Sequence, residues 1–233
     1  MPPLLWGALA LLLATQVAWQ WRHPADPPAA ADLGPPPRAS ALRLASLGEP
    51  AAAARVLMLY IQTIDFSAGR ALPYASLDYP HLVGWLDAIL ELDPRSDYPL
   101  FSAARVYAEV PDPERARLAL DFVYRAFLQD PNRRWQWLAH AALLAKHRLG
   151  DLPLARHYAA AIQNRATATE IPLWARQMEL FILEDMNELE AAKVMIGGLL
   201  ESGRLTDPAE ARFLQQRLQE LERRLAGKKD KKQ

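Results

Sequence analysis

A helix end that occurs twice is the feature that most constrains this chain. The segments Glu91–Pro94 (ELDP) and Leu128–Pro131 (LQDP) each close an apolar run with Asp-Pro, and they lie 37 residues apart. Proline cannot continue a helix, and it disfavours the helical conformation in the residue before it. Helix boundaries that return at this interval predict repeated units of two helices each.

Small residues return with nearly the same period. Ala119, Ala155 and Ala191 are separated by 36 residues in each step. Two antiparallel helices approach closely where the facing side chain is small, so each alanine marks a helix contact. One helix hairpin cannot bury its apolar face alone, and hairpins therefore stack on one another. The pattern predicts an all-α protein, namely an α-solenoid of helix hairpins.

The composition supports helix along most of the chain and excludes some functions. Alanine and leucine dominate, whereas the β-branched residues that favour strands are comparatively few. The chain length allows one good-sized folded domain, which we place at residues 40–226. The 27 basic and 27 acidic residues balance, so no overall basic field for nucleic acid is expected.

Residues 77–202 resemble the tetratricopeptide repeat (TPR) family. Aligning the family's terminal proline with Pro131 puts its two small residues on Ala119 and Ala126, and Trp137 then falls near its helix-A aromatic position. The same alignment on the preceding repeat meets larger side chains, which departs from the family pattern. The resemblance implies a superhelix whose inner surface is lined by the first helix of each hairpin, and it implies no enzymatic activity.

The N-terminus predicts a membrane anchor at residues 1–21. The stretch from Leu4 to Trp21 carries no charge, and as a helix it would span about 27 Å, enough for a thin bilayer. Trp19 and Trp21 precede Arg22, which is typical of a membrane interface. The alternative is a cleaved signal peptide, but the basic start and the small cleavage-site residues are lacking. We expect an uncleaved, single-pass anchor in the inner membrane.

Two features of the N-terminal segment favour opposite sides of the membrane for the repeat domain. Four arginines within residues 22–55 come after the span and none precedes it, which favours a cytoplasmic domain by the positive-inside rule. Single N-terminal anchors of this form commonly export the domain on their C-terminal side, which favours the periplasm. We expect the repeat domain in the periplasm.

Two further segments flank the expected repeat domain. Residues 22–39 are rich in proline and predict an extended, semi-stiff spacer between anchor and domain. Residues 227–233 contain four lysines and predict a solvated basic tail. Both segments lack the apolar periodicity of a packed element.

The sequence contains no familiar catalytic motif. GxSxG, HExxH, phosphate-loop and GxGxxG patterns are missing, and without cysteine no thiolate site can form. His140 and His147 are seven residues apart, about 10 Å along a helix, whereas a metal ion needs ligands at roughly 2.1 Å. Gly197 and Gly198 lie in an apolar run and predict close helix packing. We therefore expect no enzyme, no metal and no cofactor.

The most conspicuous polar and aromatic cluster lies in residues 133–147, at the start of a predicted first helix of a hairpin. Tryptophan and arginine on the inner surface would anchor a partner peptide. For Trp135 a groove position and a core position are equally supported, while Trp137 is interpreted as core. The function expected is a membrane-anchored scaffold that binds a protein or peptide, in the setting of envelope complex assembly; the alternative is a permanent structural subunit of an inner-membrane complex. The candidate partner-binding residues are Arg133, Arg134, Trp135, His140, Lys146 and His147.

Overall fold

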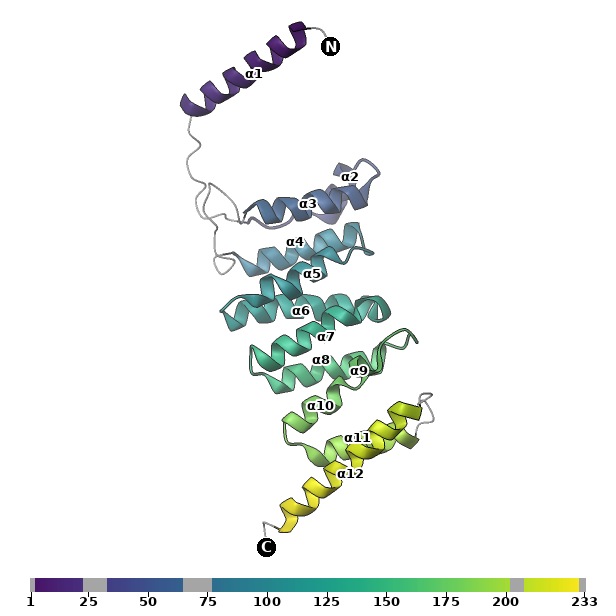
Figure 1. Ribbon diagram of the computed structural model, residues 1–233. Helices are drawn as coiled ribbons and strands as arrows, with labels where there is room; N and C mark the ends of the chain where they lie inside the picture. The colour runs from purple at the N-terminus through teal and green to yellow at the C-terminus, as the bar shows by residue number, and fades with distance from the viewer. Residues whose placement is uncertain (1–2, 23–32, 65–76, 202–207, 231–233) are drawn as a thin grey trace.

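The computed structural model describes residues 3–22, 33–64, 77–201 and 208–230, and within these ranges the chain forms helices without a strand (Figure 1). The all-α prediction is confirmed. The elements are α1 (Pro3–Arg22), α2 (Ala39–Ala45), α3 (Pro50–Ile64), α4 (Tyr79–Leu92), α5 (Tyr98–Arg105), the 3-10 helix η3 (Tyr107–Glu109), α6 (Pro113–Gln129), α7 (Pro131–His147), α8 (Leu152–Arg165), α9 (Leu173–Arg176), α10 (Met178–Asp185), α11 (Leu189–Glu201) and α12 (Pro208–Asp230).

Helices that are consecutive in the sequence pack against one another in space. Contacts join α3 to α4, α4 to α5, α5 to α6, and so on through α7 and α8 to α10, α11 and α12. Further contacts skip one helix, including those between α2 and α4, α4 and α6, α5 and α7, and α7 and α9. Figure 1 shows the result as a stack with α2 and α3 at one end and α11 and α12 at the other.

Aspartate and proline set the helix ends, as the sequence predicts. The first helix-end motif closes α4 at Leu92, and the second closes α6 at Gln129. At the helix starts, the Asp112 carboxylate accepts hydrogen bonds from the first turn of α6, and Asp151 accepts one from the N–H of Leu154. That backbone hydrogen bond lowers the pKa of the Asp151 carboxyl. These caps satisfy backbone donors that have no partner inside the helix.

Two of the three periodic alanines are buried. Ala119 and Ala155 are fully buried, whereas Ala191 is half-buried and its neighbour Ala192 takes the buried position. The prediction of close packing at the two glycines is wrong, because a Cβ added at Gly197 or Gly198 would meet nothing within 4 Å. Helix α11 packs through other side chains, and its glycine face stays open.

The buried side chains form two separate clusters. The larger one, here called the N-terminal core, extends from Leu33 to Ile182 and includes Phe122, Phe127 and Leu120. The smaller one, here called the C-terminal core, is formed by α10, α11 and α12 and consists of Leu180, Leu183, Leu189, Ala192, Ile196, Leu214 and Leu221.

The end of the proline-rich segment belongs to the folded domain. Residues 33–38 form no helix, in line with the prediction, but Leu33 is buried and the indole N–H of Trp85 donates to the carbonyl of Gly34 at 2.8 Å. The predicted spacer therefore does not extend over these residues, and residues 23–32 lie outside the described part. At the other end α12 continues to Asp230, so the predicted tail from residue 227 begins within a helix.

The membrane anchor is predicted on α1, which forms a helix of 20 residues. Within the described ranges no single helix has the length and hydropathy of a membrane span. Helices α2 and α3 reach these values only when taken together, and the chain bends by 109° between them.

Candidate binding surface

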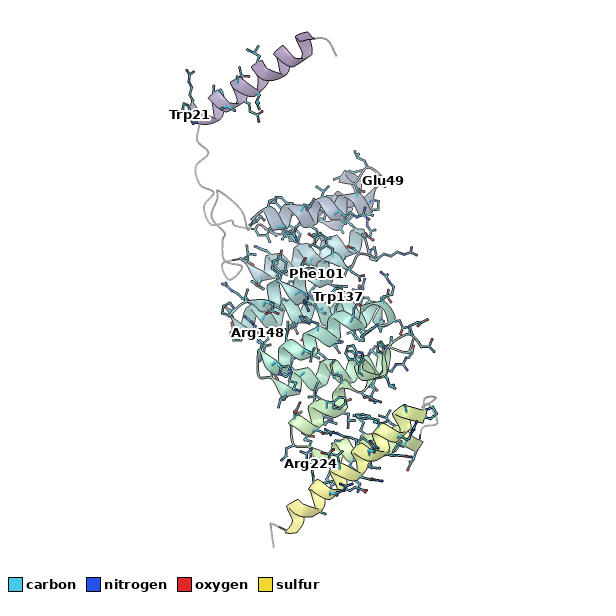
Figure 2. The ribbon with its side chains drawn as sticks, in the orientation of Figure 1. Trp21, Glu49, Phe101, Trp137, Arg148 and Arg224 are labelled. Carbon is cyan, nitrogen blue, oxygen red and sulfur yellow. The ribbon has the colours of Figure 1, made fainter. Side chains whose placement is uncertain are left out.

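An aromatic groove runs along one side of the stack where α7 lies between α5 and α9. Its walls come from Phe101 on α5, from Trp135 and Trp137 on α7, and from Trp174 on α9, and Figure 2 shows Phe101 close to Trp137. The hollow has a volume of about 500 Å³. We call it the aromatic groove; it is lined by Phe101, Arg105, Trp135, Gln136, Trp137, Ala139, His140, Leu143 and Trp174.

The aromatic walls are preformed by ring-to-ring contacts. Trp135 and Trp174 meet edge to face with centroids 5.7 Å apart, and Phe101 and Trp137 do so at 5.9 Å. Edge-to-face pairs are favourable because the positive ring edge meets the negative ring face. The indole N–H of Trp137 also donates to Asp97 Oδ1 at 3.2 Å, which fixes that ring. The groove therefore offers an ordered apolar surface.

These rings remain open to solvent. Trp174 is 53% exposed, Phe101 44% and Leu143 43%. Large apolar side chains that gather on one exposed face mark a contact surface more often than isolated ones do. The small side chain of Ala139, which is buried, leaves room between the rings.

The groove has few polar groups. Burial lowers the pKa of His140, and Arg105 lowers it further, while the Glu109 carboxylate and the Ala104 carbonyl act in the opposite direction. The imidazole is therefore neutral at pH 7, and its Nε2 is buried without a hydrogen-bond partner in the described part of the chain. Arg105 is exposed and forms no ion pair with a described residue. It carries the only permanent charge among the nine lining residues.

Arg134 is an interior residue, which corrects its assignment to a partner-binding surface. Its side chain is only 3% exposed, and its guanidinium donates to the carbonyls of Ala126 at 2.6 Å and Pro94 at 2.9 Å. These acceptors lie near the ends of α6 and α4, where helices leave carbonyls unpaired. Arg134 therefore joins the start of α7 to the ends of α4 and α6 and is not available to a partner.

Three other predicted residues also lie outside the aromatic groove. Arg133 donates to the carbonyl of Arg95 at 2.7 Å and pairs with Asp130 at 3.3 Å. Lys146 pairs with Asp185 on α10, and His147 is exposed at the end of α7. Of the six candidates, Trp135 and His140 line the groove.

Several groove residues are not among the predicted ones. Leu143 lies eight residues after Trp135 on α7, and helical spacing could have placed both on one face. Trp137, interpreted as core, is half-buried and lines the groove as well as packing on the N-terminal core. Phe101 and Trp174 lie on α5 and α9. The sequence of α7 gives no indication that these two residues pack beside it.

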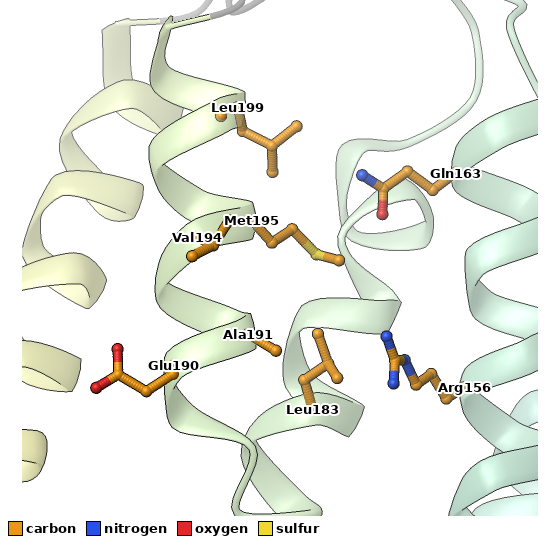
Figure 3. A pocket seen from close by; sticks show the side chains of 9 residues that line it. Arg156, Gln163, Leu183, Glu190, Ala191, Val194, Met195 and Leu199 are labelled. Atoms are coloured by element: carbon orange, nitrogen blue, oxygen red, sulfur yellow. The ribbon is translucent and has the colours of Figure 1, made fainter.

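A second, larger hollow of about 760 Å³ lies between α8, α10 and α11. Figure 3 shows Met195 and Leu199 of α11 facing Arg156 and Gln163 of α8 across a gap. The Arg156 guanidinium is already paired with Glu179 at 3.1 Å. This hollow lacks the aromatic walls of the groove, and its cation is neutralised within the chain, so we rank it second.

No other chemistry is apparent in the described part of the chain. Among those residues, no group of three or more His, Asp or Glu side chains is arranged to hold a metal ion. No protein-family model matches the chain, and neither does a curated protein or a solved structure. The aromatic groove is therefore the candidate functional site of this chain.

Proposed function

We propose that this protein is a membrane-anchored scaffold that binds an extended segment of a partner protein in the aromatic groove. The observation that carries the proposal is the exposed, preformed set of rings on α5, α7 and α9, with Trp135 paired to Trp174. Tryptophan is among the residues that contribute most to protein-binding energy, especially where a partner side chain fills a pocket beside it.

The shape of the groove favours a peptide over a small molecule. Small-molecule sites bury most of their ligand in a concave pocket, whereas Trp174 and Phe101 stand half in solvent. The neutral His140 and the free Arg105 would supply a few directional contacts at the groove. A partner segment would place an apolar side chain above Ala139 and its backbone along the rings.

The proposed architecture is a TPR-like α-solenoid. Its support is the helix boundary that recurs after 37 residues, together with the sequential packing of α4 through α8. In such a superhelix the first helices of the hairpins line the inner surface. That role fits α5, α7 and α9, because α7 contacts both of the others and all three contribute to one groove.

The proposed anchor is α1. Its residues 4–21 carry no charge, and Leu11, Leu12 and Leu13 are each more than 60% exposed. The transfer of an apolar helix from water into a bilayer lowers its free energy. We place it as a single span in the inner membrane with the stack in the periplasm, where the scaffold would serve envelope complex assembly.

The test is affinity capture of the full chain from crosslinked, detergent-extracted cells. The doubly substituted Trp135→Ala, Trp174→Ala variant should lose a stoichiometric partner that the unchanged chain retains. The matched control is Leu118→Ala, because Leu118 is 38% exposed on α6 outside the groove. A partner that survives the double substitution, or no partner at all, would remove the support for this function.

The alternative is a permanent subunit of a membrane complex. It is favoured by exposed apolar side chains away from the groove, such as Val194 at 74%. A permanent subunit would stay bound through high salt and dilution, whereas a groove-bound segment would dissociate on dilution. Sedimentation of the detergent-extracted chain across a dilution series separates the two.

A further inference from the structure

Large apolar side chains are exposed at the end of the stack formed by α2 and α3. Leu44 is 81% exposed, Leu47 92%, Val56 63% and Leu59 56%. On α3, Val56 and Leu59 lie on the side of the helix opposite to its buried residues. Those buried residues, which face the N-terminal core, are Ala54, Met58, Ile61 and Ile64.

The turn between the two helices holds a leucine outward. Leu47 has φ 51° and is followed by Gly48 with φ 90°. The left-handed region is unfavourable for a bulky residue, and asparagine or glycine would satisfy the same turn more easily. Neither burial nor backbone preference explains a leucine here. Contact with an apolar environment outside the folded chain would explain it.

Three exposed arginines lie in the same segment of the chain as this apolar surface. Arg38, Arg43 and Arg55 are exposed, and their guanidinium groups form no ion pair with any residue that the structure describes. Glu49 is the only acidic residue between positions 33 and 64, so this segment carries three arginines and one carboxylate. Exposed apolar side chains flanked by arginine are typical of surfaces that rest on anionic membranes.

We propose that the α2–α3 surface lies against the headgroup region of an anionic bilayer, as a second membrane contact beside α1. The proposal rests on the anchoring function proposed for α1, which precedes α2 in the chain and would bring the bilayer to this end of the stack. Helices α2 and α3 have the hydropathy of a span only together, and they are bent by 109°. One face of α3 is buried against the N-terminal core. The pair therefore lies along the membrane and does not cross it.

Charge favours the bilayer over a second copy of the chain. In a two-fold contact both copies would contribute this same patch. Because the patch carries Arg38, Arg43 and Arg55 against the single carboxylate of Glu49, two surfaces of like net charge would be brought together. Anionic lipid headgroups supply the opposite charge instead.

The experiment uses single cysteines in the full chain, which has none of its own. A nitrobenzoxadiazole label is placed at Leu47→Cys or Val56→Cys, and the protein is reconstituted into vesicles that contain nitroxide-bearing lipid. Phosphatidylcholine vesicles are compared with vesicles that also contain phosphatidylglycerol. Leu118→Cys on α6 is the control for the stack, and Leu12→Cys on α1 reports the anchor.

The labels at Leu47 and Val56 should be blue-shifted and quenched in the anionic vesicles, while the label at Leu118 should not. The Arg43→Gln, Arg55→Gln variant should weaken this contact by roughly fivefold for each positive charge removed. Circular dichroism of each variant verifies that the stack is folded.

The outcomes separate the two proposals. An unquenched Val56 label beside a quenched Leu12 label overturns the α2–α3 contact and leaves the anchor standing. An unquenched Leu12 label beside a quenched Val56 label overturns the anchor and supports the surface contact. Energy transfer between Val56 labels on two chains, without lipid quenching, overturns the proposal in favour of an end-to-end dimer.

Discussion

The N-terminal core and the C-terminal core differ in size and in the kinds of side chain that they bury. The first combines aromatic rings and leucines from α2 through α10, and many of its side chains are wholly buried. The second consists of seven buried residues on three helices. Helix α10 joins them, with Ile182 in the first core and Leu183 in the second.

The junction between the two cores relies on ion pairs. The buried Glu179 carboxylate of α10 pairs with Arg156 of α8 at 3.1 Å, and the buried Glu184 carboxylate pairs with Arg217 and Arg224 of α12. One short helix thus sends a buried carboxylate to each side. Ion pairs orient the helices but contribute less net stability than buried apolar side chains do. We therefore expect α11 and α12 to open locally at a lower free energy than the rest of the chain. The second hollow, between α8, α10 and α11, lies at this junction.

The largest expected effect comes from two leucines that are both fully buried, one in each core. Leu120→Ala should lower the free energy of unfolding by about 4 kcal/mol, because the dense surroundings cannot collapse into the cavity. Leu214→Ala should lower it by about 2 kcal/mol, since we expect the smaller core to relax into the space left by the side chain. Hydrogen exchange should accelerate across the stack in the first variant and only in α11 and α12 in the second. Equal acceleration of α4–α7 by both variants would mean a single cooperative unit.

A smaller effect is expected from Glu184→Gln. The change removes the Glu184 carboxylate from Arg224 and leaves Arg217 with Glu220 alone, so it should destabilise the C-terminal region by roughly 1–3 kcal/mol. The control is Glu188→Gln, whose exposed carboxylate pairs with Arg156 at 3.6 Å and should cost less than about 1 kcal/mol. Thermal denaturation of both variants measures the difference, and equal losses would show that burial of the pair is unimportant.

Glycine substitution should strengthen the weaker region. Gly197→Ala on α11 meets no neighbouring atom within 4 Å and should stabilise the chain by about 0.5–1 kcal/mol through its helix preference. Gly84→Ala is the matched change on α4, where the new Cβ would lie 3.2 Å from Pro36 Cγ. Its gain should be smaller, as chemical denaturation would report. A larger gain at Gly84 would contradict the described packing of the proline segment.

The smallest effect concerns pH. Because burial depresses the pKa of His140 below 6.5, the unfolded chain binds more protons than the folded one just below pH 6.5. The stability from this residue is present above pH 6.5 and is lost as the pH falls towards the folded pKa. Proton–carbon NMR should place the His140 titration below 6.5, and a midpoint above that value would show an exposed imidazole.

Local features were predictable from the sequence, and cross-helix geometry was not. The ends of α4 and α6 are set by proline and aspartate, which act within a few residues. The burial of Arg134 depends on carbonyls 8 and 40 residues away. Likewise Trp174 joins Trp135 only because α9 packs against α7. The packing prediction for Gly197 is wrong because an apolar run does not show whether a neighbouring helix reaches it.

We expect the partner to bind in the aromatic groove and not in the hollow between α8, α10 and α11. The most direct test places a photo-crosslinking amino acid at Gln136, which lines the groove, or at Val194, which lines the hollow. The full chain is expressed in cells, irradiated and analysed for covalent adducts. We predict a discrete protein adduct from Gln136 that disappears in the Trp174→Ala background, with none from Val194. An adduct from Val194 alone would show that the partner binds in the hollow and not in the groove.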